Sequence, residues 1–328
     1  MKKASLKDIA ESLGVSKALV SLVLNGKGDE RGINKQTQEK VRQKARELNY
    51  IPNQYARGLR IGRTNTIGVI VPDISNVFYG TLCKAIEQEA YDKGYNLIIS
   101  NTYEDVQKEK KLISDLINRN IDGLILASSF DSKNEIQGLT DTNFPLVLVD
   151  RVFDDFDVDS VSVSNIDGAK KAIEFLYSKG VKRPVCFSLS PVYVSSISER
   201  IKGYMDALKD PNKAKLVQIP HDDIEGGVAN ALDELQNEDY DGVFCVNNNI
   251  AKALIRELSM RGESLDQVRV ISFDDIEVFD IVNPKISAIA QPIHEIGKTA
   301  VNLLIDRFNN EEGHKLQQVV LDTVLVER

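Results

Sequence analysis

The residues best suited to specific chemistry lie between positions 5 and 25, where two short amphipathic helical patterns are joined by a tight turn at Gly14. Apolar residues recur at helical spacing in both patterns, so each predicted helix has one packing face. Ser16 can cap the second helix, whose outward face is small and begins with Lys17 and Ala18. This layout is typical of a helix-turn-helix, in which the second helix enters the major groove of DNA.

The neighbouring residues extend this pattern to a three-helix head. Ser5 followed by Asp8 predicts a capping box at the start of the first helix. A third helix is expected from about Lys35 to Leu48, with Asn34 as its N-cap. The same three helices could also form an ordinary bundle whose lysines only keep it in solution, and the charge distribution bears on that choice.

Charge separates the head from the rest of the chain. Through Arg63 the sequence has 14 Lys and Arg residues and 6 Asp and Glu residues, a net charge of +8. The remaining residues have 27 and 43, a net charge of −16, so the formal charge of −8 hides a basic head on an acidic body. This asymmetry favours a nucleic-acid-binding head over a plain bundle.

A domain boundary is expected close to Arg63. Residues 53–60 are too few to form a stable isolated helix, and glycines and short polar residues around them mark a flexible connection. The chain is therefore predicted to consist of a head with a hinge helix, residues 1–63, and a core, residues 64–328.

Short apolar, β-branched runs alternate with helical periods throughout the core. Strands that are apolar at every position are covered on both faces, which is typical of parallel sheets flanked by helices. Ten such runs are too many for one comfortable sheet, and the polar region at Ser164 and Asn165 divides them five and five. We predict an α/β core of two doubly wound lobes with a cleft between them, and a ligand site just beyond the carboxyl ends of the strands. The runs are 67–71, 96–100, 122–127, 145–150, 161–164, 184–188, 216–219, 242–246, 269–273 and 286–290.

Composition argues against several other classes of protein. With 42% hydrophobic and 27% charged residues the chain can bury a sizeable core. It has no run of about 18 apolar residues, and Asp8 and Glu11 interrupt what would be a signal peptide, so a cytoplasmic, nucleoid-associated protein is expected. The three histidines lack partners at ligand spacing, so no metal site is expected. The three cysteines lie in separate apolar runs and are expected to be buried free thiols: Cys83, Cys186 and Cys245.

Together these features resemble the lac repressor (LacI/GalR) family of bacterial transcription regulators, whose core is similar to periplasmic sugar-binding proteins. The resemblance covers essentially all 328 residues and rests on the order and spacing of motifs that are weak singly. The motifs are SLKDIAESLGVS, VSLVLNG, YIPNQYARGLR, TIGVIVPDISNVFY, VDR (149–151), SERIKGY (198–204), ISFDDIE (271–277) and QPIHEIGKTAV (291–301). The resemblance implies a homodimeric repressor that places one recognition helix in each half of a pseudo-palindromic operator.

Matching the family motifs residue by residue implies a set of DNA contacts. These fall on Ser5, Ser16, Lys17, Ala18, Ser21, Leu22 and Asn25 in the head and on Asn53, Ala56 and Leu59 in the hinge helix, about 53–60. Lys17 and Ala18 stand where base-reading side chains are carried. Ser16 and Asn25 either contact phosphate or only cap the helix. Leu59 either wedges between base pairs at the operator centre or packs as an ordinary helix leucine.

The sequence departs from the family pattern at four places. Leu22 stands where the family usually has Arg, and Leu19 replaces a usual Thr, so a different operator is expected, because Arg can read guanine and Leu cannot. Residues 27–32 lengthen a turn, with no role assigned to the extension. Relatives often have an aromatic lid near position 221, where this chain has His221.

In the core the resemblance implies contacts with a small-molecule effector. These fall on Phe78, Tyr79, Asp150, Ser196, Arg200, Asn247, Asp274 and Gln291. Carboxylates, amides and a guanidinium suit vicinal hydroxyls, and aromatic faces suit the C–H surface of a sugar, so a carbohydrate is expected. Alternatives remain: Arg200 could pair with Glu199 or another surface acid, Asp274 could cap the helix after its strand, and Phe78 and Tyr79 could be core.

Two other functions compete with a regulator. An enzyme is disfavoured because the chain has no strand-GxGxxG-helix, no GxxxxGK[ST] and no GxSxG element, and no cofactor is expected. A secreted sugar-binding protein would share the core but not the basic head. The sequence shows no heptad tail before Arg328, which favours a dimer over a tail-linked tetramer.

Overall fold

The computed structural model describes residues 4–50, 63–153, 155–190, 192, 194–236, 238–263, 265, 268–310 and 313–328. The chain forms two compact units, Met1–Thr64 and Asn65–Arg328. Each has its own hydrophobic core.

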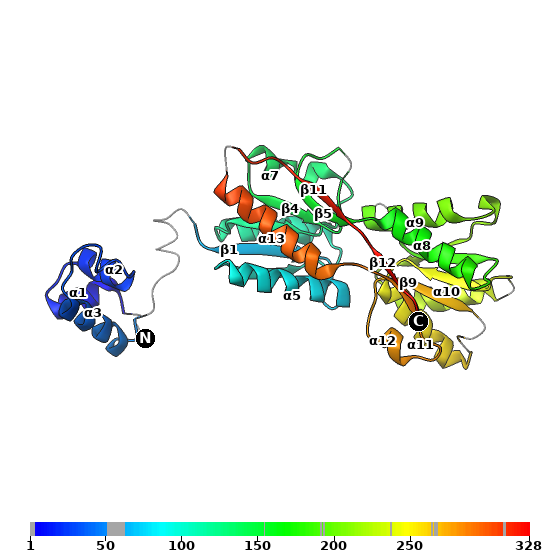
Figure 1. Ribbon diagram of the computed structural model, residues 1–328, viewed down its shortest axis with the longest axis horizontal. Helices are drawn as coiled ribbons and strands as arrows, with labels where there is room; N and C mark the ends of the chain where they lie inside the picture. The colour runs from blue at the N-terminus through cyan, green and yellow to red at the C-terminus, as the bar shows by residue number, and fades with distance from the viewer. Residues whose placement is uncertain are drawn as a thin grey trace. The chain divides into compact units, whose positions relative to one another are not determined.

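The first unit contains the three expected helices, α1 (Leu6–Leu13), α2 (Lys17–Leu24) and α3 (Lys35–Glu47) (Figure 1). The capping box is present, because the Ser5 hydroxyl accepts from the Asp8 N–H and the Asp8 carboxylate accepts from the Ser5 N–H. Gly14 has a φ of 63° and ends α1. This is the left-handed conformation that favours glycine. The helices meet around Ile9, Ala10, Val20, Val23, Val41 and Ala45.

The first lobe of the second unit is built on a six-stranded parallel sheet in the order β11-β5-β4-β3-β1-β2. Alternate strand residues face opposite layers, with Val147 under α5 and α13 and Leu146 under α6. The central strands β1, β3 and β4 are buried on both faces, which is why they are apolar at nearly every position, whereas the edge strand β2 is partly exposed. The elements are β1 (Thr66–Val71), α5 (Val77–Asp92), β2 (Asn96–Asn101), α6 (Val106–Asn118), β3 (Gly123–Leu126), α7 (Gln137–Asp141), β4 (Leu146–Val149), β5 (Asp159–Val163), α13 (Ile293–Asn309) and β11 (Gln318–Leu321).

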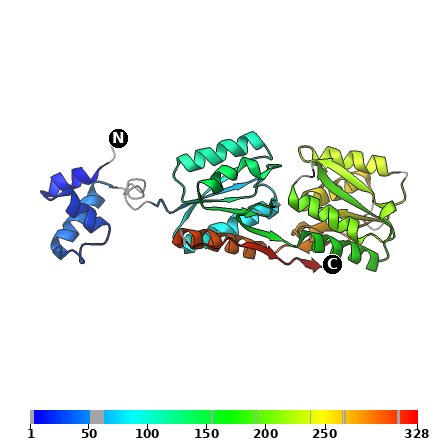
Figure 2. The same ribbon diagram turned by 90° about the horizontal axis from the view of Figure 1, so that it is seen from above.

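The second lobe repeats this plan in the order β12-β10-β9-β8-β6-β7, with β12 antiparallel to β10. Helices α8 and α9 pack together, as do α10 and α11, and the lobe has helices on both sides of its sheet (Figure 2). The elements are α8 (Asn165–Ser178), β6 (Pro184–Ser190), α9 (Ser195–Ala207), β7 (Leu216–Pro220), α10 (Ile224–Leu235), β8 (Gly242–Cys245), α11 (Asn248–Arg261), β9 (Arg269–Phe273), α12 (Val278–Ile281), β10 (Ser287–Ala290) and β12 (Val324–Val326).

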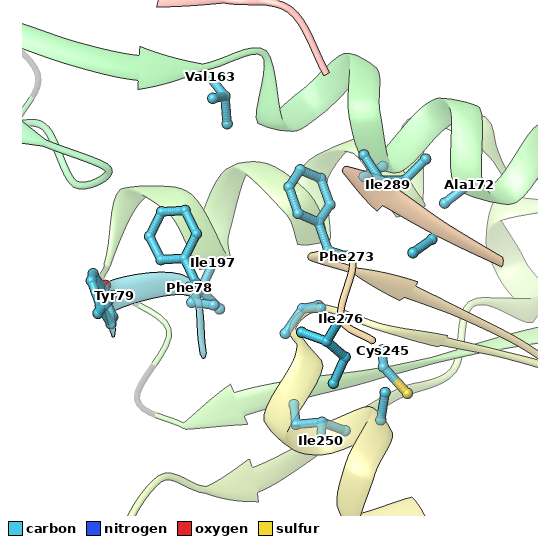
Figure 3. Close-up of a cluster of buried hydrophobic side chains, with 14 of the residues drawn as sticks. Phe78, Tyr79, Val163, Ala172, Ile197, Cys245, Ile250, Phe273, Ile276 and Ile289 are labelled. Atoms are coloured by element: carbon cyan, nitrogen blue, oxygen red, sulfur yellow. The ribbon is translucent and has the colours of Figure 1, made fainter. Parts of the chain in front are cut away.

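The chain passes between the two lobes three times, after β5, after β10 and between β11 and β12 (Figure 1). Two of the crossings are bonded together, since the Ser164 N–H donates to Leu321 O (2.9 Å) and the Thr323 N–H donates to the Ser164 hydroxyl (3.3 Å). One buried cluster extends from Phe78 and Tyr79 to Phe273 and on to other side chains of the second lobe (Figure 3). The lobes are thus joined by backbone and by packing.

The predicted fold class is confirmed, with corrections at the sheet edges. All ten predicted strands are present, but each sheet has six strands rather than five, because β11 and β12 add an edge strand to each lobe. The pairing of β12 with β10 also makes the second sheet mixed rather than wholly parallel. Cys83, Cys186 and Cys245 are buried free thiols, as expected.

Candidate functional site

A pocket lies where the carboxyl ends of both sheets face each other, the position that the parallel-sheet rule predicts. It encloses about 640 Å³ of space between atoms, part of it open to solvent. Its lining residues are Asp73, Asn76, Phe78, Tyr79, Glu104, Asp150, Arg151, Leu189, Ser196, Ile197, Arg200, His221, Ile224, Asn247, Asn249, Asp274 and Gln291.

Two aspartates occupy matching places in the two lobes. Asp150 follows β4 and Asp274 follows β9, and both have a left-handed backbone, with φ of 65° and 69°. Each donates its N–H to the adjacent strand, Asp150 to Val161 O (3.0 Å) and Asp274 to Ile289 O (2.9 Å). This conformation is uncommon outside glycine, although Asp adopts it more readily than most residues. It ends both strands in the same way and leaves both carboxylates in the pocket wall.

Arg200, on α9, lies between these two carboxylates. Its Nη2 is 3.9 Å from Asp150 Oδ1 and its Nη1 is 4.0 Å from Asp274 Oδ2. The guanidinium is held in place because Nε donates to Asn165 Oδ1 (2.9 Å) and Nη1 donates to Val246 O (2.9 Å). Arg200 is only 3% exposed, so its attraction to the two acids is weakly screened.

Asp274 and Gln291 form the wall on the second-lobe side. Gln291 Nε2 donates to Asp274 Oδ1 at 2.5 Å. Burial raises the pKa of Asp274 above its ordinary value, and Arg200 and Gln291 partly counteract this. Among the described residues no hydrogen-bond partner reaches the buried Gln291 Oε1, so this wall has an acceptor to spare.

The first-lobe wall is a chain of hydrogen bonds. Tyr79 Oη donates to Asp150 Oδ2 (2.8 Å), and Arg151 Nε is 3.7 Å from the same oxygen. Arg151 also donates to both oxygens of Glu104 (2.6 and 2.8 Å) and to Ser128 O (3.0 Å). Burial raises the pKa of Tyr79 well above its ordinary value. Burial would also raise the pKa of Glu104, but Arg151 holds it below its usual range.

Two hydrogen bonds cross from one lobe to the other beside the pocket. Asn248 Nδ2, at the start of α11, donates to Asn76 Oδ1 before α5 (3.0 Å), and the Val152 N–H donates to Ser195 Oγ on α9 (2.9 Å). Both are broken if the lobes separate, so the pocket is shaped by the relative orientation of the lobes.

All eight residues proposed as effector contacts line this one pocket. Arg200 lies beside the buried Asp150 and Asp274, at 3.9 and 4.0 Å, and Glu199 accepts a hydrogen bond from Asn165. Asp274 does not cap α12, whose N-cap is Glu277 and has no side-chain cap bond. Phe78 and Tyr79 belong to the buried cluster and also line the pocket, so the two interpretations of these rings are compatible.

Nine lining residues were not among the effector contacts expected from the sequence. They are Asp73, Asn76, Glu104, Arg151, Leu189, Ile197, His221, Ile224 and Asn249. Most of the polar ones follow the carboxyl end of a strand, so applying that rule to every strand end would have found them. Arg151 stood inside the VDR motif without being chosen, and His221 does lie at the pocket.

In the head, the outward face of α2 has few groups that can donate hydrogen bonds. Lys17 and Ala18 are exposed, and Ser21 and Leu22 are half-buried. The Asn25 amide donates to the backbone oxygen of Ser21 (2.7 Å) and to its hydroxyl (3.2 Å). Of Lys17, Ala18, Ser21 and Leu22, only Lys17 is both exposed and able to donate a hydrogen bond.

The caps of α2 are as the sequence allowed. Ser16 accepts from the Leu19 N–H (3.1 Å) and is the N-cap, and Asn25 is the C-cap. These bonds account for both residues without DNA, but they do not test a contact with phosphate. Asn53, Ala56 and Leu59 lie outside the described residues.

The turn at 27–32 is pinned by Gln38, which is buried on α3. Gln38 Nε2 donates to Asp29 Oδ1 (2.8 Å) and to Ile33 O (2.9 Å). Gly28 lies against this side chain, and a Cβ at Gly28 would be 2.5 Å from the Gln38 amide carbon. The longer turn is therefore a packed part of the head.

No helix in the described part of the chain is long and apolar enough to cross a membrane.

Comparison with known proteins agrees with this architecture. Residues 5–53 match the family model of bacterial regulatory proteins of the lacI family, and residues 64–321 match that of periplasmic binding proteins and the sugar-binding domain of the LacI family. The ribose operon repressor of Halalkalibacterium halodurans is 31% identical over 310 residues, which are 94% of this chain and 91% of that protein.

Two solved structures are similar to the chain. A LacI-family regulator from Enterococcus faecalis with bound ribose is 28% identical, with a TM-score of 0.73, over 80% of this chain and 97% of that one. The lac repressor dimer bound to operator and the anti-inducer ONPF has a TM-score of 0.85 at 24% identity, over 100% and 98% of the two chains, and shows the same fold. The chain thus has a bacterial DNA-binding domain followed by a sugar-binding core. It belongs to the LacI family of transcription regulators.

Proposed function

We propose that this chain is a homodimeric, operator-binding repressor whose DNA affinity is controlled by a small sugar held between the two core lobes. The observation that carries the proposal is the convergence of Asp150, Arg200 and Asp274, from both lobes, in one pocket. Residues 1–63 are the DNA-binding head with its hinge helix, and residues 64–328 are the effector-binding core.

The pocket chemistry supports a sugar of about monosaccharide size. Acceptors and donors alternate around it, with Asp150 beside Arg151 and Asp274 beside Arg200. Ser196 and the amides of Asn247 and Gln291 add further polar groups, and Phe78 and Tyr79 supply apolar surface for the C–H face of a ring. Because a ribose-bound relative has the same fold, pentoses are the first ligands to test.

The exposed first turn of α2 supports its assignment as the recognition helix. Lys17, Ala18 and Leu22 are the residues we assign to base edges, and Ser5, Ser16, Ser21 and Asn25 those we assign to phosphates or to orientation of the helix. Asn53, Ala56 and Leu59 are assigned to the minor groove at the operator centre on the family pattern alone.

Exposed apolar side chains support a dimer. Ile74, Val77, Tyr91, Ile99 and Tyr103 are between 39% and 69% exposed and come from α5, the edge strand β2 and the turns beside them. A second copy of the chain would cover exposed apolar side chains of this kind.

A melting experiment tests the effector site. A cognate sugar at 100 times its dissociation constant should stabilise the core by about 2.7 kcal/mol, and Arg200→Ala should remove most of this shift because buried acceptors lose their partner. Arg256→Ala is the matched control, because Arg256 lies on α11 and pairs with Glu225 on the surface. A shift retained by Arg200→Ala would place the site elsewhere.

A gel shift tests the DNA assignment. If a dimer neutralises about 6–10 phosphates, binding to selected fragments should fall by about 10³–10⁵ between roughly 50 and 200 mM salt. A protein restricted to residues 64–328 should form no discrete complex. If it does, residues 1–63 are not the reader.

A further inference from the structure

The charges that line the pocket restrict its ligand more than general carbohydrate chemistry does. The carboxyl groups belong to Asp73, Glu104, Asp150 and Asp274, and the guanidinium groups to Arg151 and Arg200. Counting His221 as a third cation still leaves the acids in excess. A ligand that brings a negative charge therefore enters a site already short of positive charge.

This chain also engages both guanidinium groups, at the two terminal nitrogens of Arg151 and at two of the three nitrogens of Arg200. The two terminal nitrogens of Arg151 face the two oxygens of Glu104, at 2.6 and 2.8 Å. This is the bidentate pairing with which arginine would otherwise hold a phosphate or a carboxylate. Arg200 Nε donates to Asn165 and Nη1 donates to the Val246 carbonyl. The charge of Arg200 lies between Asp150 and Asp274.

The polar atoms left over suit hydroxyl groups. Among the described residues Arg151 Nε has no hydrogen-bond partner, and it lies 3.7 Å from Asp150 Oδ2. Arg151 Nε is itself closed to solvent, so a ligand hydroxyl meets the carboxylates of Asp150 and Asp274, to which it can donate. A phosphate dianion can only accept, so it would leave Asp150 and Asp274 facing a like charge without donors.

The position of Glu104 is maintained against backbone preference. Tyr103 and Glu104 both have a left-handed backbone, with φ of 59° and 60°. The Glu104 N–H donates to Thr102 Oγ1 (3.2 Å), and the Thr102 hydroxyl is 3.0 Å from that of Ser129. Two successive non-glycine residues in this region are strained, and strain of this kind is concentrated at functional sites. Here it directs the Glu104 carboxylate at Arg151.

We propose that the pocket selects uncharged sugars over their phosphorylated or acidic counterparts, and that Glu104 enforces this choice by occupying the guanidinium of Arg151. The inference rests on the proposed function, since it names the chemical class of ligand for the same pocket. Glu104 is thus a specificity-determining residue.

The test compares neutral and phosphorylated forms of one sugar. Binding of D-ribose, D-ribose 1-phosphate and D-ribose 5-phosphate, and of D-glucose and D-glucose 6-phosphate, is measured by calorimetry on the full chain. The two ribose phosphates place the charge at opposite ends of the same skeleton. We expect the sugar that binds to do so at least about tenfold more tightly than its phosphates, because phosphate leaves buried carboxylates unmatched.

Glu104→Gln releases Arg151 while keeping the size of the side chain. We expect the preference for the neutral sugar to fall by about tenfold, because the freed guanidinium can hold the phosphate. Glu104→Asp keeps the charge and should keep the preference. Glu135→Gln is the matched control, because Glu135 pairs with Lys110 (2.7 Å) in the same lobe but outside the pocket, and it should leave the preference unchanged.

The outcomes separate the two proposals. If a sugar phosphate binds wild type as tightly as its parent sugar, the inference is wrong although a sugar site remains. If Glu104→Gln weakens both forms equally, Glu104 only supports the fold and the inference is again overturned. If neither neutral nor phosphorylated sugars bind, the proposed function fails and the inference fails with it.

Discussion

The ionised carboxylate of Asp274 has opposite effects on the stability of the fold and on ligand binding. Burial raises the pKa of its carboxyl, so the folded protein holds this proton more tightly than the unfolded chain does. The free energy of unfolding must then fall as the pH rises from the ordinary Asp value of 3.8 through the raised one. The ionised carboxylate is therefore unfavourable for folding. A ligand hydroxyl that donates a hydrogen bond to it would offset part of this cost.

Asp274→Asn should accordingly stabilise the ligand-free protein relative to wild type, and the difference should grow as the pH rises from 3.8 through the raised pKa of Asp274. Urea unfolding over this range measures it. Asp280→Asn is a control of opposite sign, because hydrogen bonds from Arg328 lower the pKa of Asp280, so this variant should lose stability as the pH rises. A loss for Asp274→Asn as well would show that its carboxylate stabilises the folded state. Sugar binding by Asp274→Asn should weaken by about tenfold or more.

Whether a site residue could be predicted from the sequence depends on which structural feature positions it in the pocket. Asp274, Asn247 and Gln291 each follow a strand end, and sequence pattern is enough to locate them at the pocket. Glu104 depends on an unusual backbone turn and on Arg151, 47 positions away along the chain. The strand-end rule places each residue at the pocket, but nothing in the local sequence pairs the two, so the pair required the three-dimensional structure.

At the scale of elements, the outward face of α2 carries few polar side chains. Its neighbours on the outward side are Ala18, half-buried Leu22 and Ser21, whose hydroxyl accepts from Asn25. The Lys17 ammonium and the Ser21 hydroxyl are the groups of this face that can hydrogen-bond to a base edge, whereas Ala18 and Leu22 can only make apolar contacts, such as with a thymine methyl.

Lys17→Ala should therefore relax base preference at one base pair in each half-site, by about 1–3 kcal/mol. Selection of binding sites from a random DNA library measures this. Leu22→Arg should add a preference for guanine at a second position. Lys44→Ala, which removes a charge bonded to Glu47 on α3, should alter affinity without altering preference. If Lys17→Ala selects the same sequence as wild type, Lys17 contacts only phosphate.

The elements that escaped prediction share a physical cause. The central strands among the ten predicted, such as β3 and β4, are buried on both faces and so are apolar throughout. Strands β11 and β12 have four and three residues at sheet edges, and Val320 and Val324 are each 62% exposed. Their apolar runs, VVL in β11 and VLV in β12, are only three residues long and so are a weak signal of a strand. The return of α13 to the first lobe depends on a crossing that local sequence does not encode.

For the whole core, ligand binding and the relative orientation of the two lobes are thermodynamically coupled. The pocket has walls from both lobes, and Asn76–Asn248 and Val152–Ser195 bonds cross beside it. A sugar that touches both lobes favours one orientation only by its difference in affinity for the two. Moving a dimer from 1:99 to 99:1 takes about 5.5 kcal/mol, which two pockets could supply at roughly half that amount each.

Linkage makes this coupling testable without knowing which orientation binds DNA. If the sugar changes operator affinity by some factor, operator must change sugar affinity by the same factor per site, because both describe one thermodynamic cycle. We expect equal factors when operator binding is titrated at saturating sugar and sugar binding is titrated at saturating operator. Arg200→Ala should bring both factors close to one while retaining operator binding without sugar, and Arg256→Ala should change neither. A sugar that binds tightly in the pocket and leaves operator affinity unchanged would show that the orientation of the lobes does not control the head.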